Sequence, residues 1–344
     1  MIPHFHTDFS ISDSLIFVRK SVLIYETIIL ERKIQVSQTR ILEAYKIYKN
    51  MCYVSFSGGK DSSVLADLTA RVCKVLNCKL VLWFSDTGLE FPEIKKHVKE
   101  FPTYLKNRYG IEVELIVDYP RNKSGKRISF RDVVLTEGYP VISKTISRQV
   151  HDVKKLGKDC WAYGCFNGRE TGVYNMQKWK YLIDAPFKIS NKCCQIMKKN
   201  PAKRFNKSSR RIPIIGTMAC ESKQRKTEWL HNGCNAFDKG EPSSQPISFW
   251  TENDVLEYLY RFDVPYPSVY GEICIDEDGK YYCTGYTRTG CVFCAYGCNL
   301  EKGVNRFQRL LKTHPRLWLY CMKPVRYGGL GMARVLRYIS VKYF

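Results

Sequence analysis

The segment 57–63 reads SGGKDSS and follows the apolar run MCYVSF at 51–56. Gly58 and Gly59 let backbone amides approach an anion closely, because no side chain stands in the way. A helix that begins directly after these glycines would direct the positive end of its dipole at the same point. The segment also supplies an ammonium group and three hydroxyl groups, from Lys60, Ser57, Ser62 and Ser63. These residues predict a phosphate-binding loop.

A Walker A phosphate loop is excluded at this position. That loop requires a glycine, any four residues, and then Gly-Lys followed by serine or threonine. Here Val54 stands where the first glycine would be, and Asp61 stands where the hydroxyl residue would be. The chain therefore predicts a phosphate site of a different kind.

Cysteines form the second group of residues that could do chemistry. Cys291 and Cys294 form a C-x-x-C pair, a spacing that brings two thiolates onto one metal ion or cluster with little backbone strain. Cys283 precedes this pair and Cys298 follows it. Four thiolates suit an iron-sulfur cluster or a zinc ion equally well, and free buried thiols are the third possibility.

The elements that position these residues follow an α/β pattern. The predicted strands span 51–56, 79–86, 111–118 and 210–217, and the predicted helices span 61–77, 93–109 and 251–262. Asp61 is the expected N-cap of the helix after the loop. Alternation of this kind predicts a parallel sheet with helices on both faces, and ligands bind at the carboxyl ends of such strands.

Three regions are expected along the chain. Residues 1–50 form an N-terminal helical segment, with one or two helices between Ser14 and Lys49. Residues 51–265 form the nucleotide-binding α/β domain. Residues 266–344 form a small cysteine-rich region, which opens with a predicted hairpin at 272–283.

The composition favours a folded protein with polyanionic partners. The 344 residues include 55 Lys and Arg against 33 Asp and Glu, a formal net charge of +22, which produces a positive potential over much of the surface. The longest apolar stretches are far shorter than the roughly 20 residues that a membrane-spanning helix needs. The start lacks the pattern of a secretory signal peptide, so the 15 cysteines are expected to be reduced or metal-bound in the cytoplasm.

Three segments together resemble one known family. SGGKDS at 57–62 resembles the pyrophosphate loop of the adenine nucleotide α-hydrolase superfamily, the PP-loop ATP pyrophosphatases, which split ATP between its α and β phosphates. DTGLEFPE at 86–93 resembles the DTG..FPE signature of the phosphoadenosine phosphosulfate (PAPS) reductase family within that superfamily. GTMACESKQR at 216–225 resembles the second anion loop of the same family. The chain is similar in these segments to PAPS reductase-like proteins of bacteria and their phages.

The resemblance implies a parallel sheet of the five-stranded type and a set of site residues. The implied catalytic residues are Lys60, Asp61, Asp86 and Arg225. The implied nucleotide-binding residues are Ser57, Gly58, Gly59, Lys60, Asp61, Ser62, Asp86, Thr87, Gly216, Glu221, Ser222 and Arg225. Asp61 or Asp86 would help to position the magnesium ion that accompanies ATP.

The resemblance also implies a ligand set for the cysteines. CCQIMKKNP at 193–201 resembles a motif of the assimilatory adenylyl-sulfate reductases, in which a cysteine pair and a distant C-x-x-C hold a 4Fe-4S cluster. The leading set is therefore Cys193, Cys194, Cys291 and Cys294. The rival set is Cys283, Cys291, Cys294 and Cys298, which resembles the arrangement in DNA phosphorothioation sulfurtransferases of the superfamily.

The intact loop decides which reaction we expect. Sulfonucleotide reductases bind a substrate without a β phosphate and carry a degenerate loop, whereas SGGKDS is intact here, which implies that ATP itself is used. The C-terminal ECGLH motif of those reductases is not found, and Met218 stands where their second loop carries an arginine. We therefore expect an enzyme that adenylates an acceptor and transfers sulfur to it. DNA or tRNA would be the acceptor, along the basic segments 121–127 and 198–211.

Two other functions stay open. One is a genuine PAPS or adenylyl-sulfate reductase that releases sulfite by means of another thiol. The other is a nucleotide-binding or nucleic-acid-binding module without turnover. The residues do not specify the sulfur donor, nor a partner protein that would complete the site.

Overall fold

The computed structural model describes residues 29–168, 175–238 and 240–344. Within them the chain forms two compact units. The first comprises the described residues up to Phe84, Phe91–Val117 and Phe205–Thr289, and the second comprises Ser85–Glu90, Asp118–Arg204 and Gly290–Phe344. The three regions expected from the sequence divide the chain at other points, so that division stays a prediction. The part of the predicted N-terminal helices before residue 29 lies outside the described residues.

A six-stranded sheet forms the centre of the first unit, in the order β3-β2-β1-β5-β7-β6. The strands are β1 Cys52–Ser55, β2 Leu80–Ser85, β3 Val113–Asp118, β5 Ile212–Ile215, β6 Asn235–Ala236 and β7 Ser243–Ser244. β1 pairs in parallel with β2 and β5, β5 pairs in parallel with β7, and β6 is antiparallel to β7. The four predicted strands are confirmed. β6 and β7 were not predicted, because strands of two residues carry no detectable periodicity.

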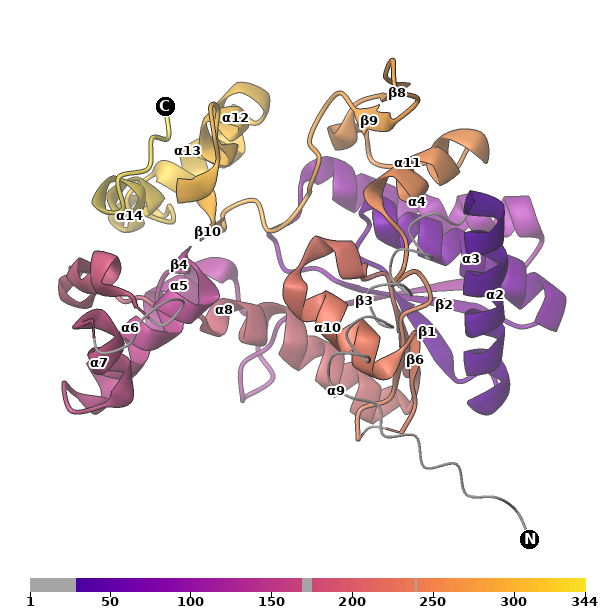
Figure 1. Ribbon diagram of the computed structural model, residues 1–344, viewed down its shortest axis with the longest axis horizontal. Coiled ribbons are helices and arrows are strands. Elements are labelled where there is room, and N and C mark those ends of the chain that lie inside the picture. The colour runs from indigo at the N-terminus through magenta and orange to yellow at the C-terminus, as the bar shows by residue number, and fades with distance from the viewer. Residues whose placement is uncertain (1–28, 169–174, 239) are drawn as a thin grey trace, which may run out of the picture. The chain divides into compact units, whose positions relative to one another are not determined.

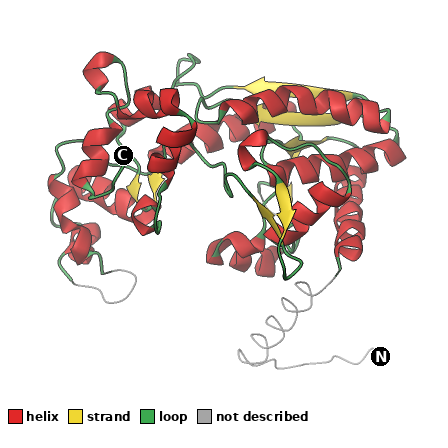
Figure 2. Cartoon of the chain, turned by 90° about the horizontal axis from the view of Figure 1, so that it is seen from above, coloured by secondary structure: helices red, strands yellow, loops and turns green. Residues whose placement is uncertain are grey.

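Helices cover both faces of this sheet (Figures 1 and 2). The main ones are α2 Leu30–Ile47, α3 Lys60–Leu76, α4 Pro92–Tyr109, α9 Asn200–Ser209, α10 Lys223–Asn232 and α11 Glu252–Arg261. Successive strand residues face opposite sides of a sheet. Cys52 of β1 lies near Cys73 of α3, whereas Tyr53 and Trp83 pack against the ring of Phe205 in α9. The predicted α/β fold is confirmed.

Helix α11 begins at a capping box and is tied to α2. Thr251 Oγ1 accepts from the backbone N–H of Asp254, and the Asp254 carboxylate accepts from the N–H of Thr251 at 2.6 Å. This confirms the capped start predicted from the sequence. The same carboxylate accepts a 2.6 Å hydrogen bond from the buried ammonium of Lys33. A buried lysine requires such a partner, because burial without one is costly.

The predicted hairpin is also present in the first unit, as β8 Ile273–Ile275 and β9 Tyr281–Cys283. In the second unit β4 Val141–Ile142 pairs in parallel with β10 Ala295–Tyr296. Its helices are α5 Phe130–Thr136, α6 Lys144–Leu156, α7 Trp161–Phe166, α8 Lys192–Cys194, α12 Arg306–Thr313, α13 Pro315–Met322 and α14 Met332–Tyr338. No described helix has both the length and the apolar character that crossing a membrane requires.

Helix α4 supports the start of α3 through a buried histidine. His97 Nε2 lies 2.8 Å from Ser63 Oγ. Ser63 Oγ also lies 3.1 Å from the carbonyl oxygen of Gly59, so the serine links the histidine of α4 to the first turn of α3. The imidazole lies beside the rings of Phe56 and Phe101. Burial lowers the pKa of His97 to about 4.

His97 should therefore make stability depend on pH. Its pKa in the folded chain lies below the ordinary value of 6.5, so the unfolded chain takes up a proton first as the pH falls. The free energy of unfolding should decrease between about pH 6.5 and pH 4, by about 3 kcal/mol in total. Urea unfolding at several pH values should show a smaller loss for His97→Gln, which keeps a donor for Ser63. The exposed His231 provides the control, and His231→Gln should behave as wild type. An unchanged pH profile in His97→Gln would contradict this assignment.

Candidate functional site

The predicted phosphate loop lies between β1 and α3, and its geometry requires glycine twice. Gly58 has φ +75°, and a Cβ there would lie 2.5 Å from Val98 Cγ2 and 2.9 Å from Ile94 Cγ2. Gly59 is the N-cap of α3, and a Cβ there would lie 3.1 Å from Tyr270 Oη. The backbone N–H groups at the start of α3 have no partners within the helix. The loop thus brings unshielded donors to the positive end of a helix of 17 residues.

The serine hydroxyls of the loop hold its own shape. Ser62 and Ser63 both donate to the carbonyl of Gly59, at 2.9 Å and 3.1 Å. Ser57 Oγ lies 3.1 Å from Ser62 Oγ and accepts from the N–H of Gly59 at 3.4 Å. The hydroxyl proton of Ser62 is therefore engaged within the loop, and a role for Ser57 and Ser62 on the nucleotide stays a prediction. The expected N-cap was wrong, because Gly59 caps α3 and Asp61 lies in its first turn.

Lys60 is buried, and its ammonium has partners on several sides. Its Nζ donates to the Thr287 carbonyl at 3.0 Å and lies 3.3 Å from Glu252 Oε1. It also lies 3.7 Å from Asp61 Oδ1 and 5.3 Å from the centre of the Tyr270 ring. Burial disfavours the charged form, but Asp61, Tyr270 and Glu252 outweigh it and raise the pKa of Lys60. The ammonium therefore stays charged at the loop.

Asp61 has an unsatisfied oxygen beside this ammonium. Its Oδ1 is buried and has no hydrogen-bond partner. Burial raises the pKa of Asp61, with the charge of Lys60 opposing the shift. A buried carboxylate oxygen without a partner is costly, and oxygen ligands of this kind suit a hard divalent cation. The residues present thus fit a magnesium ion at Asp61.

The second predicted loop follows β5 and lies against the first. A Cβ on Gly216 would lie 3.4 Å from the carbonyl oxygen of Asp61, so the two loops approach closely at this glycine. Glu221 Oε2 accepts from the N–H of Met218 at 3.1 Å and pairs with Arg225. Gly216 and Arg225 therefore both lie near Asp61, and their contact with a nucleotide stays a prediction.

Helix α10 carries Arg225 towards the loop. Ser222 is its N-cap and accepts from the N–H of Arg225 at 3.2 Å, so the Ser222 hydroxyl holds the turn. Burial lowers the pKa of Arg225, and the neighbouring charge of Arg288 lowers it further. The charges of both guanidinium groups act to lower the pKa of Asp61 and so oppose the effect of burial. Ser222 and Glu221 thus position Arg225, and their direct contact with a nucleotide stays a prediction.

The motif at 86–93 begins in the second unit. Asp86 Oδ1 accepts from the N–H of Gly88 at 3.1 Å, and its Oδ2 lies 3.4 Å from Arg127 Nη2. Thr87 Oγ1 donates to Glu90 at 2.5 Å. These hydrogen bonds stabilise a compact turn at residues 86–90. The assignment of Asp86 and Thr87 to nucleotide binding stays a prediction.

Sequence reasoning missed four residues of this site, namely Glu252, Tyr270, Thr287 and Arg288. Their partners in the loop are about 190 to 230 positions away, as in the pairs Lys60–Glu252 and Lys60–Thr287. The available signal was the segment YTRTG at 286–290, which directly precedes the C-x-x-C pair.

The leading set of cysteines lies entirely within the second unit. Cys193 Sγ is 4.0 Å from Cys194 Sγ, and both Cys291 and Cys294 act electrostatically on Cys193. A hydrogen bond from Cys193, aided by Lys144 and Lys198, lowers the pKa of Cys194 to about 6. Burial raises the pKa of Cys291 and raises that of Cys294 to about 11. The four thiols therefore influence one another electrostatically, and their pKa values differ.

The rival set is divided between the units. Cys283 ends β9 in the first unit, where Lys60 and Glu252 are its charged neighbours. Cys298 lies in the second unit, and its thiol donates to the carbonyl of Ala295 at 3.0 Å. Within the described residues, no three His, Cys, Asp or Glu side chains stand ready to hold a metal ion. The choice of ligands therefore stays a prediction. The leading set supplies four thiols, which is the chemistry that an iron-sulfur cluster requires.

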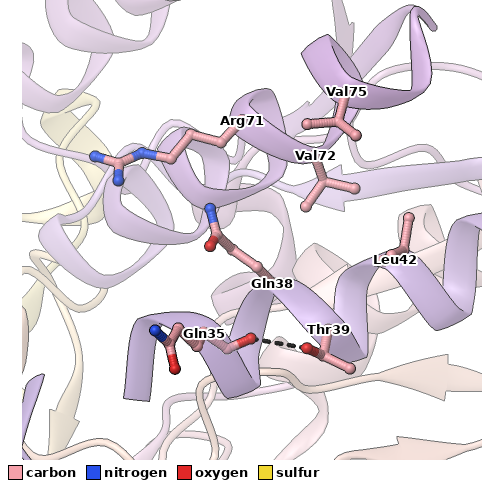
Figure 3. A pocket seen from close by; sticks show the side chains of 7 residues that line it. All are labelled: Gln35, Gln38, Thr39, Leu42, Arg71, Val72 and Val75. Atoms are coloured by element: carbon pink, nitrogen blue, oxygen red, sulfur yellow. Dashed lines mark hydrogen bonds between the residues drawn. The ribbon is translucent and has the colours of Figure 1, made fainter. Parts of the chain in front are cut away.

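A separate cavity of about 320 Å³ lies between α2 and α3. Figure 3 shows that its lining comes from facing sides of the two helices, with Gln35 and Thr39 on α2 and Arg71 and Val75 on α3. Arg71 lies 11 positions after Lys60, which is about 16 Å along a helix. This cavity is thus remote from the phosphate loop and does not belong to the site.

Comparison with protein families gives one match over most of the chain. The model for the phosphoadenosine phosphosulfate reductase domain matches residues 51–164 and 168–296. Two uncharacterized proteins of Methanocaldococcus jannaschii are similar to the chain. One is 26% identical over 319 residues, which is 90% of this chain and 56% of the relative. The other is 25% identical over 282 residues, 81% of this chain and 42% of the relative. The chain thus spans about half the length of these curated relatives.

Two solved structures are similar at low identity. NMN synthetase from Francisella tularensis matches at 13% identity and a TM-score of 0.33, over 69% of this chain and 72% of that one. The U34-tRNA thiolase NcsA from Methanococcus maripaludis, solved with its 4Fe-4S cluster, matches at 13% identity and a TM-score of 0.37, over 91% of this chain and 82% of that one. TM-scores this low support no inference about the site, so the family match carries the assignment.

The steric demand at Gly58 gives a direct test of the loop. Gly58→Ala should lower the free energy of unfolding by about 2 to 4 kcal/mol, from the left-handed backbone and the contact with Val98 and Ile94 together. Gly279 is a matched control, because it has the same φ of +75° with open space around it. Gly279→Ala should cost only the backbone strain, about 1 kcal/mol. Urea unfolding measures both changes, and equal losses would show that the loop is not packed tightly on α4.

Proposed function

The chain belongs to the phosphoadenosine phosphosulfate reductase domain family of the PP-loop superfamily, and from this premise we propose that it is an ATP-cleaving enzyme. The proposed reaction breaks the bond between the α phosphorus and the oxygen that bridges to the β phosphate. The observation that carries the proposal is the loop at Gly58–Lys60, where backbone donors, a helix N-terminus and a charged lysine converge. Such a site favours a polyphosphate over a neutral ligand.

The reaction requires little covalent chemistry from the protein. An acceptor oxygen attacks the α phosphorus, pyrophosphate leaves with the bridging oxygen, and the acceptor becomes adenylated. Lys60, Arg225 and the amides of the loop would position the phosphates and stabilise the charge that develops on them. A magnesium ion at Asp61, with Asp86 as the second candidate, would neutralise charge on the phosphate oxygens.

The second part of the proposal is sulfur transfer to the activated acceptor. Cys193, Cys194, Cys291 and Cys294 would hold a 4Fe-4S cluster, with zinc as the alternative. A cluster bound there would supply a site that holds or delivers sulfide. Support comes from the 4.0 Å between Cys193 Sγ and Cys194 Sγ and from the electrostatic effect of Cys291 and Cys294 on Cys193.

A nucleic acid is the proposed acceptor. The net charge of +22 favours a polyanionic partner. The predicted basic loop at 121–127 is exposed along its whole length, and Lys199, Lys203 and Lys207 project from the basic segment at 198–211. These residues would bind the phosphate backbone of DNA or tRNA.

Sulfonucleotide reduction is the second candidate, and the family match itself favours it. In that reaction the chain would bind PAPS or adenylyl sulfate and release sulfite. The two candidates differ in the phosphates that the site receives, because only ATP carries β and γ phosphates beyond the α phosphorus.

Turnover of labelled nucleotide separates these candidates. With ATP, magnesium, sulfide and mixed tRNA or DNA, we expect pyrophosphate when the acceptor is adenylated and AMP when sulfide displaces it. Lys60→Ala should lower the rate by at least about a hundredfold, because an ammonium facing the phosphates is lost. Lys79→Ala is the control, since Lys79 is exposed and pairs only with Glu112 and Glu114. Sulfite release from adenylyl sulfate without AMP from ATP would favour the reductase. ATP binding without any product would favour a non-catalytic module.

Iron content after anaerobic reconstitution tests the cysteine assignment. Cys193→Ala and Cys291→Ala should each lose most of the roughly four iron atoms per chain that the wild type takes up. Cys283→Ala is the discriminating control and should retain them. Iron retained in Cys193→Ala but lost in Cys283→Ala would favour the rival set. A wild type that takes up zinc and no iron would overturn the cluster.

A further inference from the structure

The segment Thr287–Thr289 is held against the phosphate loop from both of its ends. The Thr287 carbonyl accepts from Lys60 Nζ at 3.0 Å. Thr289 Oγ1 lies 2.6 Å from Tyr270 Oη, which in turn accepts from the backbone N–H of Lys60 at 3.3 Å. Both residues that flank Arg288 are therefore anchored, directly or through one hydroxyl, to the first residue of α3.

The backbone just before this segment is fixed as well. Gly285 N–H donates to the Tyr270 carbonyl at 2.8 Å, and Tyr286 N–H donates to the Val269 carbonyl at 3.0 Å. A Cβ on Gly285 would lie 2.6 Å from the carbonyl carbon of Tyr270, so the two stretches of backbone are in direct contact. Tyr270 itself is 2% exposed. The position of Arg288 at the loop is thus set by packing and hydrogen bonds.

Arg288 stands out because nothing in the described part of the chain satisfies its guanidinium. It is exposed and makes no ion pair or hydrogen bond there. Its electrostatic neighbours are Asp61 of the first loop and Arg225 of the second. Two arginines that converge from different segments repel each other, and an anion bound between them would relieve that repulsion.

We infer that Arg288 and Arg225 form a clamp for the polyphosphate of a nucleoside triphosphate bound at Gly58–Lys60. The inference rests on the proposed ATP-binding function and adds a second arginine, from a different segment than α10, that would hold the phosphates. A planar guanidinium binds phosphate oxygens through two parallel N–H donors. Lys60 cannot supply this contact alone, because its ammonium is already shared among Thr287, Glu252 and Asp61. The affinity for ATP should therefore depend on Arg288. The affinity for AMP should not, because AMP lacks the β and γ phosphates.

Calorimetric titration with ATP, AMP and inorganic tripolyphosphate tests the clamp. Arg288→Ala should lower the affinity for ATP and for tripolyphosphate by about ten- to a hundredfold. This is the loss expected when charge-assisted hydrogen bonds are removed. AMP should bind as it does to wild type, and Arg288→Lys should bind ATP with intermediate strength. Arg316→Ala is the matched control, because it removes one exposed arginine charge from α13 in the other unit. The thermal midpoint should be unchanged in Arg288→Ala, since this side chain makes no contact that stabilises the fold.

The outcomes separate the clamp from the function on which it rests. If wild type binds ATP and Arg288→Ala binds it equally well, the clamp is wrong and ATP binding stands. An equal loss of affinity for AMP and ATP in Arg288→Ala would also overturn the clamp, because Arg288 would then not act on the terminal phosphates. If wild type binds neither ATP nor tripolyphosphate, the proposed function fails and the clamp fails with it.

Discussion

The rest of the first unit depends on the attraction between the N-terminus of α3 and negative charge. Its free backbone N–H groups and the dipole of the helix make this end a site for negative charge, provided that the chain before it carries no side chain. Gly58 and Gly59 meet that condition. At Gly58, α4 packs so closely that no Cβ fits, and at Gly59 a Cβ would lie 3.1 Å from Tyr270 Oη. The hydrogen bonds of Ser62 and Ser63 to the Gly59 carbonyl, and of His97 to Ser63, then fix the turn. A binding surface made of backbone is thus held in place by side chains from α3 and α4.

The charges around this helix end explain which ligand it suits. Lys60 is buried yet stays protonated because carboxylates surround it, and one oxygen of Asp61 is left without a hydrogen bond. Such a group of charges suits a ligand that brings both negative phosphates and a cation. The segment 284–289 closes on the same loop, and the sequence continues within two residues into Cys291, which belongs to the thiols of the second unit. One short stretch of chain therefore supplies residues to both chemical groups of this protein.

The sequence allowed the four longer strands of the central sheet, the helices α3, α4 and α11 and the loop residues to be predicted, because these depend on local patterns. β1, α3 and the hairpin β8–β9 follow from periodicity and turn residues within about 15 positions. The glycines of the loop were predicted because they would let backbone amides approach an anion. The structure shows a different demand at Gly58, where a Cβ would clash with Val98 and Ile94. The N-cap was misassigned because aspartate is usually the better cap, whereas here the extended Gly59 takes that position. Tyr270 and Glu252 could not be predicted, because only tertiary folding brings them to Lys60 and no local pattern marks them.

Hydrogen exchange at the amides of 57–63 tests most directly whether this helix end binds a polyphosphate. Bound ATP with magnesium predicts slower exchange of the N–H groups of Gly58, Gly59 and Lys60. Phosphate oxygens would replace Ser57 Oγ and Tyr270 Oη, which accept from Gly59 and Lys60 only at 3.4 Å and 3.3 Å. AMP at the same saturation should protect them far less, because it lacks the β and γ phosphates. Unchanged exchange of these three amides in ATP-saturated protein, or equal protection by AMP, would contradict a triphosphate site at this loop.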